Sequence, residues 1–364
     1  MAQFDPDRFR DPALAAGLVA RIARLAGRPA ALMEVCGTHT MAIAQHGIRG
    51  LIPASITLLS GPGCPVCVTA LADIDRMIAI ASLDGVITAT FGDMVRVPGS
   101  AGSLGRAKAG GADVRTVYSP LDALAIAAAN PGRQVVFAGV GFETTAPTIA
   151  ATVLEAERDG LGNFSVYPAF KLVPPALEAV LSGAGAAVDG LLLPGHVSAI
   201  IGTGPYRFIA ERYRTPCAIA GFEPLDILEA IALLLEQRES GRTGIANEYR
   251  RGVPEAGNPE ALRLLDRVFQ PVDAVWRAVG ALPRSGLGFR EPYAAFDASR
   301  KFPVTVVPAP EPEGCRCGQV MMGLARPDQC GHFGTSCTPS RPVGPCMVSS
   351  EGACAAWYKY GVAA

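Results

Sequence analysis

Short apolar runs recur along the chain, and each is followed by a turn and then by apolar residues at helical spacing. Strands that alternate with helices in this way predict βαβ units and a parallel sheet. The chain is therefore expected to have an α/β fold. The runs that we interpret as strands are Ala30–Val35, Ile56–Ser60, Val86–Phe91, Val114–Tyr118, Gln134–Val140, Phe164–Phe170, Gly190–Leu193 and Cys217–Ala220.

The predicted strands divide into two similar halves. Each half ends with the same Pro-Leu-Asp-x-Leu pattern, at Pro120–Leu124 and at Pro224–Leu228. This repetition predicts an internal duplication, with two similar four-stranded parallel α/β domains at residues 28–130 and 131–238. Residues 1–27 and 239–364 are assigned to a third domain, which is partly helical and contains the cysteine-rich tail.

Six of the ten cysteines lie between Cys315 and Cys354, in a stretch rich in glycine and proline. Such a segment cannot order itself by burying apolar surface, so a metal centre or disulfides are expected to hold it. The pattern C-x14-C-x6-C-x16-C supplies four thiolates, which suit either zinc or a [4Fe–4S] cluster. It comprises Cys315, Cys330, Cys337 and Cys354.

Zinc sites usually contain closely spaced cysteine pairs, and their absence from this quartet favours the iron–sulfur cluster. The third domain is therefore predicted to be an iron–sulfur domain. Zinc, disulfides and merely buried thiols stay as alternatives. Either Cys317 or Cys346 could also replace one of the four ligands.

Polar motifs follow the predicted strands at the carboxyl ends, where open α/β sheets place their functional sites. Cys36 and His39 follow the first strand, and a histidine three residues after a cysteine could reach the same ligand. Cys64 and Cys67 follow the second strand and precede a helix, so their thiol pKa values are expected to be lowered. This pair is suited to disulfide exchange or to metal binding.

The second half carries further candidates. Glu143 and Thr144 occupy the turn equivalent to that of Cys36, so the two turns are expected to face each other across a cleft. His196 follows the seventh strand, although a histidine satisfied by local backbone is an equal alternative. Cys217 has no nearby partner and is interpreted as a packing residue.

Charge and composition argue against several classes of protein function. A formal net charge of −1 gives no electrostatic reason to expect nucleic acid binding. The sequence has no run of about 20 apolar residues, so no membrane span is predicted. The first residues carry no export signal, so we expect a cytoplasmic, reducing environment in which structural disulfides are rare. Dinucleotide, Walker and Gly-x-Ser-x-Gly motifs are absent from the sequence.

Five motifs together resemble the HypD family of hydrogenase maturation proteins. The resemblance extends from about residue 30 to the end of the chain. The motifs are Cys36–His39, Gly61–Cys67, Gly141–Thr145, Pro194–Ser198 and Gly344–Cys354.

The resemblance implies a scaffold for assembling the Fe(CN)2CO unit of [NiFe]-hydrogenase, in a stable complex with HypC and with HypE as a transient cyanide donor. It implies that Cys36 is the iron-binding thiolate, that Cys64 and Cys67 form a redox-active dithiol, and that the quartet holds a [4Fe–4S] cluster. Such a metallocentre-assembly scaffold has redox activity, and the resemblance leaves open whether it is an enzyme. The alternative from another class is a free-standing iron–sulfur disulfide reductase.

Overall fold

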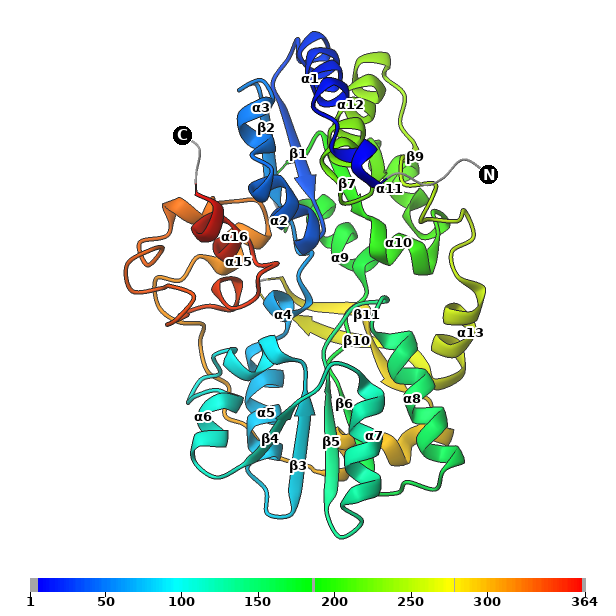
Figure 1. The fold of residues 1–364 in the computed structure, drawn as a ribbon, viewed down its shortest axis with the longest axis vertical. Coiled ribbons are helices and arrows are strands. Elements are labelled where there is room, and N and C mark those ends of the chain that lie inside the picture. The colour runs from blue at the N-terminus through cyan, green and yellow to red at the C-terminus, as the bar shows by residue number, and fades with distance from the viewer. Residues whose placement is uncertain (1–5, 185–186, 278, 362–364) are drawn as a thin grey trace.

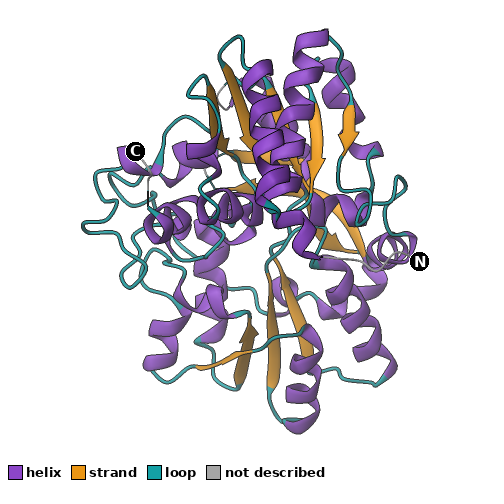
Figure 2. Ribbon diagram, turned by 45° about the horizontal axis from the view of Figure 1, so that its top comes forward, coloured by secondary structure: helices purple, strands orange, loops and turns teal. Residues whose placement is uncertain are grey.

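The computed structural model describes residues 6–184, 187–277 and 279–361, and these contain two separate parallel sheets (Figures 1 and 2). The first, called the β1 sheet, has the strand order β2-β1-β7-β8-β9. Its strands are β1 (Ala30–Glu34), β2 (Ile56–Ser60), β7 (Gly190–Pro194), β8 (Cys217–Ala220) and β9 (Ile245–Asn247). The second, called the β3 sheet, has the order β4-β3-β5-β6. Its strands are β3 (Val86–Thr90), β4 (Asp113–Thr116), β5 (Gln134–Gly139) and β6 (Phe164–Pro168).

The predicted α/β fold with two parallel sheets is confirmed, and every predicted strand is present. The chain leaves the β1 sheet after β2, builds the whole β3 sheet, and returns at β7. The sheets therefore do not follow the predicted domain ranges 28–130 and 131–238. Strands that are buried on both faces all look alike in sequence, so the apolar pattern does not reveal which strands pair. Here Leu32 pairs with Gly190, where a side chain would crowd Leu32 and Leu234.

Helices cover both sheets, and α1 shows how one of them begins. The Asp11 side chain accepts hydrogen bonds from the backbone N–H groups of Ala13 and Leu14, at 2.7 and 3.1 Å, before Pro12 starts the helix. The α-helices of the body are α1 (Pro12–Leu25), α2 (Gly37–Gln45), α3 (Ile48–Leu51), α4 (Pro65–Val68), α5 (Leu71–Ala81), α6 (Leu104–Ala109), α7 (Pro120–Ala129), α8 (Ala146–Arg158), α9 (Val173–Ala179), α10 (Gly195–Ile201), α11 (Arg207–Arg212), α12 (Pro224–Ser240), α13 (Pro259–Val268) and α14 (Ala298–Lys301).

The predicted grouping of residues 1–27 with the tail is wrong. Helix α1 packs against α12 on the β1 sheet, with Ile22 fully buried among the apolar side chains of that helix. The physical reason is the apolar face of α1, which needs a larger apolar surface than the turn-rich tail offers. Among the described residues, no helix is both long and apolar enough to cross a membrane.

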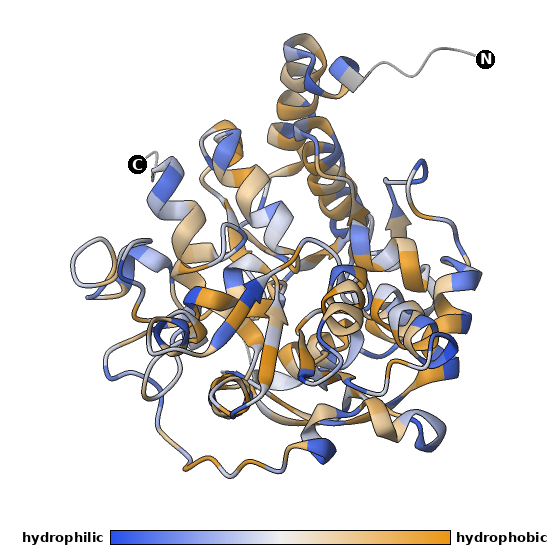
Figure 3. Cartoon of the chain, turned by 60° about the horizontal axis from the view of Figure 1, so that its bottom comes forward, coloured by the Kyte–Doolittle hydropathy of each residue, from blue (hydrophilic) through white to orange (hydrophobic). Residues whose placement is uncertain are grey.

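An antiparallel hairpin of β10 (Phe269–Trp276) and β11 (Gly280–Phe289) lies between the two sheets (Figure 1). This hairpin is not among the strands expected from the sequence, because Pro271 and Pro283 obscure the alternation of a strand. The buried indole of Trp276 donates to Ser285 Oγ at 2.9 Å and fixes the hairpin internally. Coloured by hydropathy, the central strands are largely apolar and the outer loops largely polar (Figure 3).

Residues 312–361 form the C-terminal cysteine region, which consists mostly of turns (Figure 2). Its helices are α15 (Cys317–Met321), α16 (Ala353–Tyr360) and the 3-10 turns η6 (Pro327–Gln329) and η7 (Pro345–Met347). Helix α16 packs against α2, and η7 packs against α4. The cysteine region is thus seated on the two turns that follow β1 and β2 (Figure 1).

Candidate metal and thiol site

The turns after β1 and β2 are locked to each other through their backbones. Gly61 N–H donates to the Glu34 carbonyl at 2.8 Å, and Gly37 N–H donates to the Gly63 carbonyl at 3.0 Å. A Cβ atom on Gly63 would lie 2.2 Å from the nitrogen of Cys36, so only glycine fits this crossing. The contact holds the loop of Cys36 directly against the loop that leads to the dithiol.

Cys36 precedes the first turn of α2 and is almost fully buried. Burial raises the pKa of its thiol to about 12, although the backbone N–H groups of His39 and Thr38 and the Thr38 hydroxyl act in the opposite direction. The thiol is therefore protonated at neutral pH. Because a metal binds the thiolate, metal binding here would release a proton and would gain from the same N–H donors.

Cys36 and His196 follow neighbouring strands, β1 and β7, at the point where the strand order of the β1 sheet reverses. This reversal is the usual ligand site of an open α/β sheet. The His196 ring is exposed at its edge and stacks on Phe222, with ring centroids 3.9 Å apart. Partial burial lowers its pKa, while the nearby Glu351 carboxylate raises it. A neutral imidazole is thus presented beside the Cys36 turn.

His39 lies inside the protein and serves the fold. Its Nε2 donates to the carbonyl oxygens of Gly221 and Ala220, at 2.9 and 3.2 Å, and so links α2 to the end of β8. Burial lowers its pKa to about 4, so the ring is neutral. Its Nδ1 has no partner among the described residues. The Thr40 hydroxyl is likewise engaged, donating to Glu34 Oε1 at 3.0 Å, which leaves Thr38 as the nearer hydroxyl to Cys36.

Glu143 lies at the end of β5, with Thr144 beside it and partly exposed. Its Oε1 accepts from the Val173 N–H at 3.0 Å, and burial raises its pKa to about 7. The fully buried Tyr206 interacts electrostatically with both Glu143 and Cys36. Tyr206 therefore lies within electrostatic range of both the Glu143 turn and the Cys36 turn.

Cys64 and Cys67 are both buried, and their sulfur atoms lie 2.6 Å apart. A disulfide has an S–S distance of about 2.05 Å, so bond formation needs only a small movement. The Cys67 N–H also donates to Cys64 Sγ, at 3.3 Å. The predicted lowering of pKa is wrong for Cys67, because burial raises its pKa well above the usual value and α4 is a single short turn.

The C-terminal cysteines converge on this dithiol. The Cys346 thiol interacts with the thiols of Cys67, Cys317 and Cys354, and Cys317 also interacts with Cys315. The contact with Cys317, the contact with Cys67 and burial raise the pKa of Cys346, while Cys354 acts in the opposite direction, so Cys346 too is protonated without a metal. Together these contacts place Cys317 and Cys346 at the centre of the cluster.

The predicted quartet is only partly assembled. Cys337 interacts electrostatically with Cys317 and Cys315, and Cys354 interacts with Cys337. The Cys330 thiol instead lies at 3.8 Å from the carbonyl oxygen of Gly314, next to Cys315. Within the described ranges, no three His, Cys, Asp or Glu side chains stand ready-arranged around a single metal ion.

An open space lies beside two of these thiols. A cavity of about 260 Å³ borders Cys315 and Cys317, and a Cβ atom on Gly344 would lie 2.6 Å from the Cys317 sulfur. Glycine thus leaves room for the thiols. Cys217 lies away from them in the β1 sheet, fully buried, with its thiol 3.6 Å from the Thr215 carbonyl, and is a packing residue.

Sequence reasoning missed Glu351 and Tyr206. Glu351 accepts a 2.7 Å hydrogen bond from the Thr38 hydroxyl. It also packs against Gly37, where an added Cβ atom would lie 2.5 Å from the Cβ atom of Glu351. It joins the cysteine region to the Cys36 turn. Its only signal was its place inside the Gly344–Cys354 motif, and Tyr206 had none.

These features define an α/β protein with buried thiols at its strand ends, capped by a cysteine-rich region. The family model HypD, described as the hydrogenase formation hypA family, matches residues 13–361. The chain belongs to the HypD family.

Three relatives that align along nearly the whole chain are each described as a hydrogenase maturation factor. The "Hydrogenase maturation factor HypD" of Rhodobacter capsulatus is 49% identical, with 97% of each chain covered. That of Azotobacter vinelandii is 46% identical over 98% of this chain and 96% of its own. That of Escherichia coli K12 is 46% identical over 92% and 90%. The protein therefore has a role in hydrogenase maturation.

Proposed function

We propose that the protein is the cytoplasmic scaffold on which the Fe(CN)2CO unit of [NiFe]-hydrogenase is assembled, with Cys36 holding the iron. The observation that carries the proposal is the position of Cys36. Its sulfur lies at the reversal of the β1 sheet, where the N–H groups of Thr38 and His39 stabilise a thiolate. A thiolate is a soft ligand and suits low-spin ferrous iron that carries cyanide and CO.

Cys64 and Cys67 are proposed to be the redox partner of this site. Closing their disulfide removes two electrons and two protons from the pair, and the reverse reaction supplies them. The 2.6 Å separation of the sulfur atoms supports this role. The backbone contact of Gly37 with Gly63 supports a short path between the dithiol and Cys36.

A [4Fe–4S] cluster is proposed to be held by Cys315, Cys330, Cys337 and Cys354. When bound, it supplies electrons one at a time. The spacing of the four cysteines and the convergence of neighbouring thiols support it. Cys317 and Cys346 are the alternatives for one of the four places.

Family membership supports the proposed partners. HypC would form a stable complex and share the iron through one of its own cysteines, and HypE would dock transiently and deliver cyanide. His196, Thr144 and Glu143 line the strand ends on which such partners would act. Glu143, with its raised pKa of about 7, is suited to exchanging a proton there.

The test is infrared spectroscopy of the protein purified anaerobically with its small partner. Cyanide and CO stretching bands on bound iron are expected. The close Cys64–Cys67 pair also favours a second candidate function, a free-standing disulfide reductase. Turnover of a disulfide substrate without any partner, and without these bands, would favour that candidate.

A further inference from the structure

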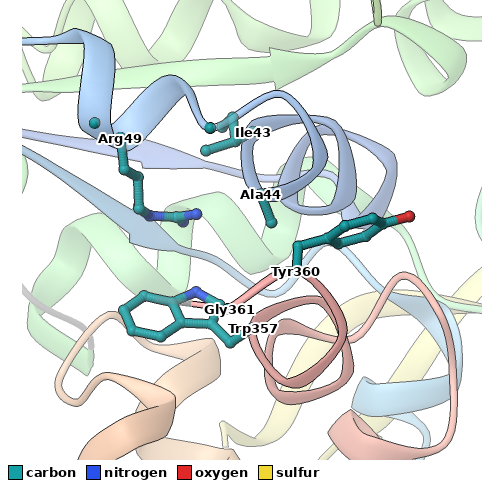
Figure 4. A pocket seen from close by; sticks show the side chains of 8 residues that line it. Ile43, Ala44, Arg49, Trp357, Tyr360 and Gly361 are labelled. Carbon is teal, nitrogen blue, oxygen red and sulfur yellow. The ribbon is translucent and has the colours of Figure 1, made fainter. Parts of the chain in front are cut away.

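A small cavity lies between α2, α3 and α16, away from the thiols (Figure 4). Its volume is about 60 Å³, and its wall includes Ile43, Arg49, Trp357 and Tyr360. None of the residues that line it is acidic. A water molecule takes up about 30 Å³ of liquid water, so this cavity accommodates a group of a few non-hydrogen atoms.

The wall of this cavity contains hydrogen-bond donors without acceptors. The Trp357 side chain is 7% exposed, and its Nε1 has no partner among the described residues. Nε and Nη2 of Arg49 are also buried without a partner there. A buried donor left unpaired costs about 1–3 kcal/mol, so these groups call for an acceptor.

The two side chains are arranged as a pair. The Arg49 guanidinium carbon stands over the Trp357 ring, 5.2 Å from its centroid, and Figure 4 shows both nitrogen-bearing groups close together. Guanidinium stacked on an aromatic ring is held in orientation while its N–H groups stay free to bond.

Glu34 does not satisfy this arginine. Its Oε1 is 3.8 Å from Arg49 Nη2, beyond hydrogen-bond distance. That oxygen already accepts hydrogen bonds from Thr40 and Ser60, at 3.0 and 2.9 Å. The positive charge of Arg49 is therefore only partly balanced from inside the protein.

We infer that this cavity binds a carboxylate group, held by the guanidinium of Arg49 and the indole N–H of Trp357. A carboxylate supplies the planar acceptors that a guanidinium binds best, and it compensates the charge. The Arg49 side chain is 25% exposed, so the site can be reached from solvent. The inference does not depend on the proposed function.

Binding here would reach the Cys36 turn. Thr40 donates both to Glu34 Oε1 and to the Cys36 carbonyl, at 3.0 and 3.2 Å. A carboxylate at Arg49 competes with Glu34 for the same cation, so it would alter the hydrogen bonds at Cys36. The source of the carboxylate is either a free small acid or the carboxyl end of another protein chain.

The test uses the full-length protein labelled with ¹⁵N at tryptophan and titrated with acetate. The chain has two tryptophans, and Trp276 is an internal control because its indole already donates to Ser285. The Trp357 indole resonance should shift and saturate while that of Trp276 stays in place. Acetamide, which has the same shape without the charge, should have no such effect, and Arg49→Met should abolish the acetate response.

The source is distinguished by a short peptide with a free carboxyl end and the same peptide with an amidated end. Tighter binding of the free-ended peptide than of acetate indicates a protein terminus, and equal or weaker binding indicates a free acid. Three results would overturn the inference: no saturable shift, an equal response to acetamide, or an unchanged acetate response in Arg49→Met.

Discussion

The two parallel sheets and the C-terminal cysteine region are held together by different forces. Strand β7 buries Leu191, Leu192 and Leu193 completely and pairs with strands on both sides. The cysteine region has short helices and turns, and its interior combines thiols such as Cys346 with apolar side chains such as Met321. Apolar burial and backbone pairing therefore stabilise the sheets, whereas the cysteine region has no strand pairing, and under the proposed function it also depends on what its thiols bind.

The largest expected effect separates these two regions. Alanine at any one of Cys315, Cys330, Cys337 or Cys354 should abolish the visible iron–sulfur absorbance and expose the cysteine region to proteases. The sheets should keep their cooperative unfolding, because no strand contributes to the quartet. Absorbance and limited proteolysis measure the two parts.

The matched control for the cysteine variants is Cys217→Ala, which removes a buried thiol from β8 outside the cluster. It should keep the absorbance and lose some stability of the sheet. Should Cys317→Ala or Cys346→Ala remove the absorbance while one of the four does not, the ligand set is wrong.

The second effect concerns the crossing of the two strand-end turns. Gly63→Ala places a methyl group 2.2 Å from the backbone nitrogen of Cys36, so the backbone must move. We expect a loss of more than about 4 kcal/mol in the free energy of unfolding, measured with denaturant. Gly50→Ala is the control, since nothing lies within 4 Å of its added Cβ. Equal stability of the two variants would show that the crossing is not tight.

The third effect is a pH dependence of stability that arises from a buried carboxyl group at the end of β5. Burial raises the pKa of Glu143 to about 7 in the folded protein, from a usual value of 4.5. The folded state then holds a proton that the unfolded state has lost, so stability falls as pH rises from about 4.5 to 7. The full contribution is at most about 3 kcal/mol. Glu143→Gln should flatten this slope in thermal unfolding between these pH values, and an unchanged slope would contradict the buried proton.

The smallest effect concerns the hydrogen bond from Thr38 to Glu351, which joins the Cys36 turn to the cysteine region. Thr38→Val removes the hydroxyl that donates to Glu351, and we expect a loss of about 1 kcal/mol with faster proteolysis of the cysteine region. Thr335→Val is the control, because that hydroxyl bonds only to Gly331 and His332 within the cysteine region. Similar proteolysis of both variants would mean that Glu351 does not hold the regions together.

The same comparison explains how much of the fold was predictable. Apolar periodicity located the strands of both sheets, because such strands are short, apolar and bounded by turns. It did not locate their pairing, since β1 finds β7 more than a hundred residues away through packing that has no local pattern. The hairpin of β10 and β11 was missed because its prolines resemble those of a linker.

The site was predictable where a motif follows a strand. Cys36, Cys64 and Cys67 lie at the strand ends, where the turns were expected. The hydrogen bonds of His39 were not predictable, because its spacing from Cys36 says nothing about the carbonyl groups of Ala220 and Gly221 that accept from its ring. The lowered pKa expected for Cys67 was wrong, because a local helix start cannot reveal burial by a distant segment.

The central claim is that Cys36 holds the iron, and infrared spectroscopy of Cys36→Ser tests it most directly. Serine keeps the shape of the turn but removes the soft ligand. Purified anaerobically with its small partner, the variant should fold, keep the iron–sulfur absorbance, and lack the cyanide and CO bands that are expected of the unaltered protein. Wild-type bands in Cys36→Ser would show that the iron is held elsewhere and would contradict the assignment.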